Sequence, residues 1–321
     1  MPTPVRADPV ELAWAAGFFD GEGSTFARSE ATRPGYRRLN VAVPQLGGPV
    51  VPDVLVRFQR ALRGLGSIGN PDRDVYQWRT TDYSQSRDAL ALLWPRLSAI
   101  KRRQARAAIA LVDAQYASGR YRARPWRRKP RLLITNPRRR DLTASDNERL
   151  DRAWAAGFLD AEGCFGLVRG RARVGGPRWY RIRASASQHG KVGVPAAVLV
   201  RLHRILGVGR IERHGEIDDF KWVAEGLPAI ERVLAVVGPW LGSVKSEQAV
   251  DSMRAYASQT RLKGDEDRCK RGHLYDRRVT LKTDRTRAYC KACARLLARR
   301  QRAALGITPR AFRDISRRYT E

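Results

Sequence analysis

A ten-residue phrase occurs twice in this chain of 321 residues, as WAAGFFDGEG from Trp14 and as WAAGFLDAEG from Trp154. Similarity extends well beyond the phrase. Three more pairs of segments repeat at a constant offset of 144 residues: LVRFQRALRGLGSIG from Leu55 and LVRLHRILGVGRIE from Leu199, YQW from Tyr76 and FKW from Phe220, and WPRLSAIKRRQA from Trp94 and GPWLGSVKSEQA from Gly238. One offset kept over three blocks indicates a duplicated unit.

Each copy reads as helix, strands, helix, strands, helix, which predicts an α+β fold. Asp8 and Pro9 have the types expected at the start of a helix, and Ser145 with Glu148 has the capping-box spacing in the second copy. The segments RRLNVAVPQ and WYRIRASASQ alternate apolar and polar residues, which predicts strands with one buried face.

The repeated phrase itself predicts a tightly packed helix pair. Small residues recur every fourth position and so fall on one face of a helix. Such a stripe lets two backbones approach closely, which gives a reason for glycine inside a helix. We predict a helix interface formed by Ala13, Gly17, Gly21, Ala153, Gly157 and Ala161.

The charge balance points to a polyanion as partner. Sixty-two Lys and Arg face 32 Asp and Glu, a formal net charge of +30. This excess suits nucleic acid better than an anionic membrane, because the sequence has no long apolar stretch. An ordinary solvated face remains the alternative for each polar strand face, and we predict DNA contacts from Arg38, Asn40, Arg181 and Arg183.

Each phrase ends on an acid, Glu22 or Glu162, followed by a glycine that we expect to stop the helix. Two helices packed along their small residues would bring these carboxylates together. Like charges in contact need a proton or a cation between them, and hard divalent ions take oxygen ligands. We therefore predict a metal site of Mg²⁺ or Mn²⁺ for phosphodiester chemistry. A solvated acid at each helix end is the alternative.

The segments AAGFFDGEG (15–23) and AAGFLDAEG (155–163) resemble the motif of the LAGLIDADG homing endonucleases. The resemblance covers roughly residues 8–258 and implies the single-chain form, a duplicated αββαββα fold with pseudo-twofold symmetry whose two sheets straddle DNA. It implies that Glu22 and Glu162 bind the catalytic metals. The preceding acids, Asp20 and Asp160, match the motif too and suggest a structural role.

The resemblance extends to further residues near the metals. The family's pattern L-x-x-x-K-x-x-Q is matched by LSAIKRRQ and LGSVKSEQ, which contain Lys101 and Lys245. Each would stabilise charge on the cleaved phosphate or lower the pKa of a water molecule. Gln45 and Gln188, at strand ends, resemble the glutamines that order the attacking water. Lys101 alternatively belongs only to a basic run.

Two more segments bear on nucleic acid. Residues 120–140 contain ten Arg or Lys and no acid, and we expect phosphate contacts from Arg127, Arg128 and Lys129 rather than a plain solvated linker. Near the C-terminus, C-x3-H is followed by C-x2-C, a ligand set typical of one closed structural Zn²⁺ site. Its predicted ligands are Cys269, His273, Cys290 and Cys293.

The predicted organisation is a first repeat (1–118), a basic linker (119–142), a second repeat (143–260) and a zinc-binding, DNA-contacting module (261–321). We expect a monomeric endonuclease, a hydrolase of phosphodiester bonds, that makes a metal-dependent staggered break in a long double-stranded DNA site, as in intron homing. A splicing maturase, a DNA-binding regulator and, less well, a nucleoid or ribosomal protein are the alternatives. Composition suggests the bacterial cytoplasm and nucleoid, or a phage origin.

Overall fold

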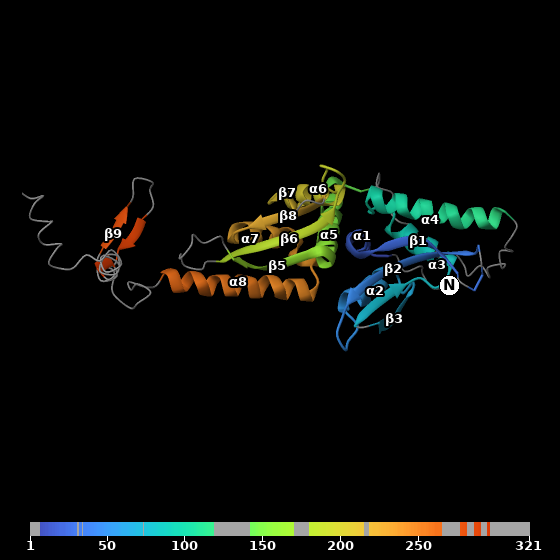
Figure 1. The fold of residues 1–321 in the computed structure, drawn as a ribbon, viewed down its shortest axis with the longest axis horizontal. Coiled ribbons are helices and arrows are strands. Elements are labelled where there is room, and N and C mark those ends of the chain that lie inside the picture. Colours follow the sequence, from blue (N-terminus) through green and yellow to red (C-terminus); the bar gives the residue numbers. More distant parts are fainter. Residues whose placement is uncertain are drawn as a thin grey trace, which may run out of the picture. The chain divides into compact units, whose positions relative to one another are not determined.

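The two halves of the duplicated sequence fold into the same succession of elements (Figure 1). The structure is a computed structural model, and it describes residues 7–30, 32–33, 35–72, 74–118, 142–169, 180–214, 218–264, 277–280, 286–289 and 294–295. The first half contains α1 (Pro9–Glu22), β1 (Ser24–Ser29), β2 (Arg37–Leu46), α2 (Asp53–Ala61), β3 (Ser67–Asp72), β4 (Val75–Arg79), α3 (Tyr83–Leu93) and α4 (Ala99–Ala117).

The second half contains the equivalent series. Its elements are α5 (Ala144–Glu162), β5 (Gly163–Arg169), β6 (Tyr180–His189), α6 (Ala197–Leu206), β7 (Arg210–His214), β8 (Asp219–Glu225), α7 (Leu227–Val237), the 3-10 turn η2 (Gly238–Trp240) and α8 (Ser243–Gly264). Each half forms one antiparallel four-stranded sheet, in the orders β1-β2-β4-β3 and β5-β6-β8-β7.

Each half ends in two helices where the sequence predicted one. In the first half, Pro95 follows α3 and has no backbone N–H with which to continue it. Ser98 then starts α4, because its hydroxyl accepts a hydrogen bond from the Lys101 backbone at 3.3 Å. Gly238 and Pro239 mark the same break before α8.

Capping residues explain where the two motif helices begin. Asp8 caps α1 by accepting a hydrogen bond from the Val10 backbone at 2.8 Å. The capping box predicted at Ser145 and Glu148 is wrong. Thr143 and Asp146 have the same spacing two residues earlier and exchange two hydrogen bonds of 3.1 Å.

Helices α1 and α5 lie side by side between the two sheets (Figure 1). A Cβ atom on Gly17 would lie 1.9 Å from the Trp154 carbonyl oxygen, and one on Gly157 would lie 1.9 Å from that of Trp14. At Gly21, a Cβ would meet the Cβ of Ala161 at 2.5 Å. Ala13 and Ala153 are fully buried in the same seam. The backbones of the two helices are therefore in direct contact.

The core continues from this seam into both halves. Its largest fully buried side chains are Trp14, Trp78, Trp154, Trp222, Phe18, Phe19, Phe58 and Phe158. Helices α3 and α4 contact the first sheet, and α6 and α7 contact the second. Residues 1–256 form one unit, which contains both halves.

Residues 257–321 form a second unit, in which β9 (Arg277–Thr280) and β10 (Thr286–Tyr289) pair as an antiparallel hairpin. None of the described helices combines the length and the apolar character that a membrane crossing requires.

Candidate active site

The two motif helices end at the same place with a glutamate each. Glu22 is the last residue of α1 and Glu162 is the last residue of α5. The Cγ atom of Glu162 lies 3.0 Å from the point where a Cβ on Gly21 would be, so its side chain rests against the residue preceding Glu22. Both glutamates are half-buried. The close helix packing thus places two carboxylates in one cluster.

Glycine after each acid makes this arrangement possible. The two helices end before Gly23 and Gly163, as predicted, and both glycines have extended backbones, with φ of −70° and −73°. A Cβ on Gly23 would lie 2.3 Å from the Phe19 ring, and one on Gly163 would lie 2.3 Å from the Leu159 carbonyl oxygen. Lack of space, rather than backbone conformation, selects glycine here.

Burial and like charge oppose ionisation of the glutamates. Burial raises the pKa of Glu162 to about 7, and the neighbouring carboxylate of Glu22 adds to the rise. The pKa of Glu22 is also raised by burial, while the charges of Lys101 and Lys245 lower it. A cation bound between the two carboxylates would offset both effects.

Two lysines, one from each half, act on these carboxylates. Lys101 on α4 donates a hydrogen bond from Nζ to the carbonyl oxygen of Gly23. Burial lowers the pKa of Lys101, opposed by the charges of Asp20, Glu162 and Glu22. Lys245 on α8 lowers the pKa of Glu22 and Glu162 electrostatically. The structure therefore brings both predicted lysines to the glutamates.

The two predicted glutamines occupy equivalent positions on β2 and β6 but differ in their contacts. Gln188 donates from Nε2 to Oε1 of Glu162 at 2.7 Å. Gln45 pairs with Tyr76 in the sheet, as Gln188 pairs with Phe220. Within the described part of the chain, nothing donates to the buried Oε1 of Gln45. One amide thus orients a glutamate, whereas the other presents an unused acceptor.

The polar faces of the sheets differ in charge pairing. On β2, Arg38 is exposed and donates to the Thr81 carbonyl oxygen, and Asn40 is half-buried. On β6, Arg183 donates from Nε to Glu225 at 2.9 Å, and Arg181 forms a 3.5 Å ion pair with the same acid. The DNA-facing residues predicted from β6 are therefore partly neutralised by an acid on β8.

Other predicted residues fall outside the part of the chain that the structure describes. These are the linker residues Arg127, Arg128 and Lys129 and the zinc ligands Cys269, His273, Cys290 and Cys293. Among the described residues, no three His, Cys, Asp or Glu side chains gather as a metal-binding group. The glutamate pair supplies two.

Sequence reasoning missed residues that join the halves. Trp14 and Trp154 donate to the acids Asp160 and Asp20 of the opposite half, and Arg57 and Arg201 stack over the tryptophan rings. The repeat contains all of these residues at matching positions, but periodicity gives no partner across the seam. Glu225, the last residue of β8, was missed as well.

No protein-family model and no curated protein matches the chain. Solved structures do resemble it. I-SmaMI bound to an uncleaved DNA target in the presence of calcium ions aligns with a TM-score of 0.57 at 14% identity, over 80% of this chain and 92% of that chain. The LAGLIDADG meganuclease I-AabMI bound to uncleaved DNA gives 0.57 at 16% identity, over 79% and 92%.

The LAGLIDADG homing endonuclease I-GzeII in complex with its DNA target gives a TM-score of 0.57 at 14% identity, over 81% of this chain and 94% of that chain. All three alignments span most of both chains, so the similarity includes both halves and not one sheet alone. Together with the paired motif helices and the two antiparallel sheets, they show that this chain has the LAGLIDADG homing-endonuclease fold.

Proposed function

We propose that the protein is a site-specific DNA endonuclease that hydrolyses phosphodiester bonds and makes a metal-dependent, staggered double-strand break. The observation that carries this proposal is the cluster of Glu22, Glu162, Lys101 and Lys245 at the seam between two sheets with basic faces. The fold supports it, because the similar structures of I-SmaMI, I-AabMI and I-GzeII are complexes with DNA.

The residues present fit a hard divalent cation. Glu22 and Glu162 offer carboxylate oxygens, and burial with mutual repulsion favours a cation between them. The buried, unused Oε1 of Gln45 suits a hydrogen bond from a water molecule. We infer that the two glutamates would hold Mg²⁺ or Mn²⁺. Such an ion, when bound, polarises phosphate oxygens and lowers the pKa of water.

The chain's own residues would prepare the phosphate and the nucleophile. Lys101, fixed on the Gly23 carbonyl oxygen, places positive charge beside both glutamates, where a scissile phosphate would gain negative charge. Gln188 fixes the orientation of Glu162 by its 2.7 Å hydrogen bond. Arg38 and Asn40 on one sheet and Arg181 and Arg183 on the other would set the register on the DNA.

The paired halves suit a double-strand break, since each carries one glutamate and one lysine. A non-cutting maturase or regulator on this fold would need neither lysine and would gain nothing from two half-buried carboxylates that repel each other. The retained cluster therefore favours cleavage. The zinc site proposed from Cys269, His273, Cys290 and Cys293 would stabilise the C-terminal unit without taking part in cleavage, because four protein ligands leave no open position.

The test is cleavage of a DNA library that contains the sequences flanking the gene, in Mg²⁺ and in EDTA. We expect paired cuts at one site in Mg²⁺ only, and none from the Glu22→Gln, Glu162→Gln double variant. Specific, tight binding by the wild type without cuts in Mg²⁺ or Mn²⁺ would contradict the proposal and favour the maturase or regulator.

A further inference from the structure

The aspartates of the two motifs, Asp20 and Asp160, are buried between the halves. Asp20 and Asp160 are 2% and 3% exposed. Each accepts a hydrogen bond from the tryptophan of the opposite half. Trp154 Nε1 donates to Asp20 Oδ2 at 2.9 Å, and Trp14 Nε1 donates to Asp160 Oδ2 at 2.7 Å. The contact is thus reciprocal across the pseudo-twofold axis.

Each aspartate also accepts hydrogen bonds from the start of the helix that carries the lysine of its own half. The Ser98 backbone N–H lies 3.0 Å from both oxygens of Asp20, and Ser98 is the N-cap of α4, three residues before Lys101. The Gly242 N–H lies 2.9 Å from both oxygens of Asp160, three residues before Lys245. A motif aspartate therefore connects a lysine helix to a tryptophan of the other half.

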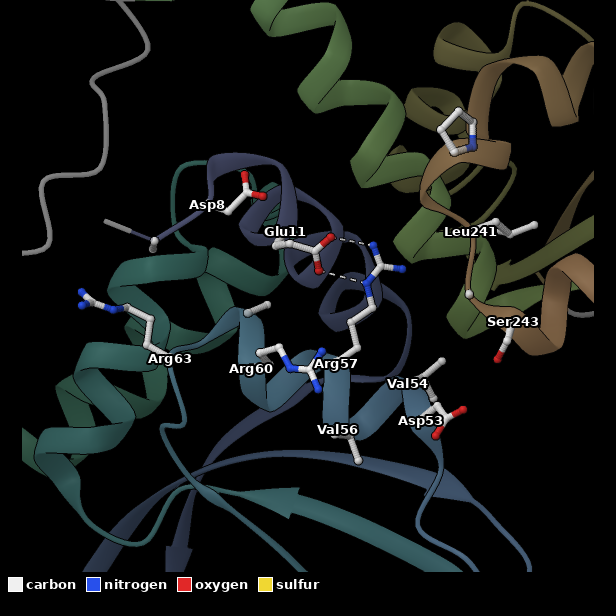
Figure 2. Close-up of a pocket in the computed structure, with 14 residues that line it drawn as sticks. Asp8, Glu11, Asp53, Val54, Val56, Arg57, Arg60, Arg63, Leu241 and Ser243 are labelled. Atoms are coloured by element: carbon white, nitrogen blue, oxygen red, sulfur yellow. Dashed lines mark hydrogen bonds and ion pairs between the residues drawn. The ribbon is translucent and has the colours of Figure 1, made fainter. Parts of the chain in front are cut away.

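An arginine on each side completes the connection. Arg57 lies over the Trp14 ring at 4.0 Å and donates to the Trp240 carbonyl oxygen at 2.7 Å, two residues before Gly242. This guanidinium donates two hydrogen bonds, of 2.8 and 2.9 Å, to the carboxylate of Glu11. Figure 2 draws them as dashed lines. The pocket in that view is lined by α1 and α2 of the first half and by Leu241 and Ser243 of the second.

The other side of the seam repeats this geometry. Arg201 lies over the Trp154 ring at 3.8 Å and donates to the Arg96 carbonyl oxygen at 2.8 Å, two residues before Ser98. Asp151 accepts from Arg201 at 2.8 Å. We call each set of three residues a crossed clamp. Arg57, Trp14 and Asp160 clamp the start of α8, which carries Lys245. Arg201, Trp154 and Asp20 clamp the start of α4, which carries Lys101.

We propose that Asp20 and Asp160 are positioning residues and that each crossed clamp sets the active-site lysine of one half from the tryptophan and arginine of the other. The role of the lysines rests on the proposed function. The consequence is mutual dependence, because neither half can place its lysine without the opposite half packed against it. Each lysine therefore depends on a clamp of its own, and each clamp needs the opposite half.

Strand-resolved cleavage tests the proposal. Single-turnover rates would be measured on a target labelled on each strand, and the strand slowed most by Lys101→Ala defines the Lys101 strand. We expect Trp154→Phe to slow that strand about tenfold, the effect of losing one buried hydrogen bond, with little change on the other strand. Trp14→Phe should do the reverse. The effects of Asp20→Asn and Trp154→Phe on the cleavage rate should be non-additive, because the two residues share a hydrogen bond. The effects of Asp20→Asn and Trp14→Phe should be additive.

Matched controls separate positioning from stability. Trp78 and Trp222 are equally buried and donate to the Leu65 and Val208 carbonyl oxygens at 2.9 and 3.0 Å within their own halves. Trp78→Phe and Trp222→Phe should slow both strands alike or neither. Arg201→Lys keeps the charge but loses the forked contact, so it should slow cleavage of the Lys101 strand as Trp154→Phe does. It replaces Trp154→Phe as the test if that variant folds poorly.

A second readout needs no cleavage. Amide hydrogen exchange of the free protein should rise about tenfold at 98–104 in Trp154→Phe and at 242–248 in Trp14→Phe, since each lost hydrogen bond frees one helix start. This arm decides the proposal even if the wild type does not cut. Two results would overturn it. One is an equal rise in exchange at both helix starts in either variant, and the other is slower cleavage of the DNA strand assigned to the lysine of the tryptophan's own half.

Discussion

Burial and the neighbouring charge of Glu22 both oppose ionisation of Glu162. Its pKa lies at about 7 in the folded protein against an ordinary value of 4.5, so between these values the folded state holds a proton that the unfolded chain has lost. Stability contributed by this group therefore falls as the pH rises from about 4.5 to about 7.

The first prediction follows from that sign. In the absence of divalent cations, Glu162→Gln should raise the free energy of unfolding relative to the wild type more at pH 8 than at pH 5, because the amide cannot ionise. Urea denaturation at the two pH values measures the difference. A difference of equal size at both pH values would contradict the assignment of Glu162 to a buried like-charge pair.

Gly17 gives the second prediction at this scale. Its Cβ position lies 1.9 Å from the Trp154 carbonyl oxygen and 2.9 Å from the Phe158 nitrogen, both backbone atoms that cannot move aside. Gly17→Ala should therefore lower the free energy of unfolding by about 3 kcal/mol, the upper range for forced overpacking. Thermal or urea unfolding measures it.

Gly48→Ala is the matched control, since among the described residues nothing beyond its chain neighbours lies within 4 Å of its Cβ position. It should change stability by less than about 0.5 kcal/mol. Similar losses from both substitutions would show that the α1–α5 seam can relax and is not a fixed backbone contact.

At the scale of elements, the two sheet faces have unequal electrostatics. Glu225 ends β8 and holds Arg183, Arg181 and Arg210, and hydrogen bonding from Arg183 lowers its pKa. On β2 and β4, the equivalent face carries Arg38 and Arg79, and the pairs that β2 makes with β1 and with β4 contain no acid. In these strand pairs, the arginines of the first sheet have no acidic partner, whereas those of the second are oriented by Glu225.

The third prediction uses this difference. Glu225→Gln should strengthen non-specific DNA binding and steepen the dependence of log K on log salt by about one unit, since at least one arginine becomes free to contact a phosphate. Fluorescence anisotropy over a salt series measures the slope. Glu231→Gln on α7 makes the same charge change away from the strands and should leave the slope nearly unchanged; equal slopes in the two variants would contradict the pairing argument.

Sequence patterns predicted most of these elements but not their contacts. The alternation of apolar and polar residues in RRLNVAVPQ and WYRIRASASQ matches β2 and β6. In a half-buried strand, every second side chain faces the core and the others face solvent. The break between α3 and α4 was missed although Pro95 marks it. Glu225 was missed because an acid at a strand end has no period; only its register opposite Arg183 gives it a role.

At the scale of the whole molecule, the duplication predicted two similar halves and an interface of small residues between them. The proximity of the glutamates follows from that interface, since the contact extends to Gly21 and Ala161, the residues that precede them. The crossed pairing of Trp14 with Asp160 and of Trp154 with Asp20 did not follow, because a repeat shows equivalent positions and not which copy each side chain faces.

The most direct test of the central claim is strand-resolved cleavage in Mg²⁺ by Glu22→Gln and Glu162→Gln, each measured beside the wild type on one target. We expect either single substitution to abolish the double-strand break, leaving at most a nick, while DNA affinity in Ca²⁺ changes by less than about tenfold, because both carboxylates serve one centre across the seam. A single variant that still breaks both strands at the wild-type rate would show that the paired glutamates are only part of the packing between the halves.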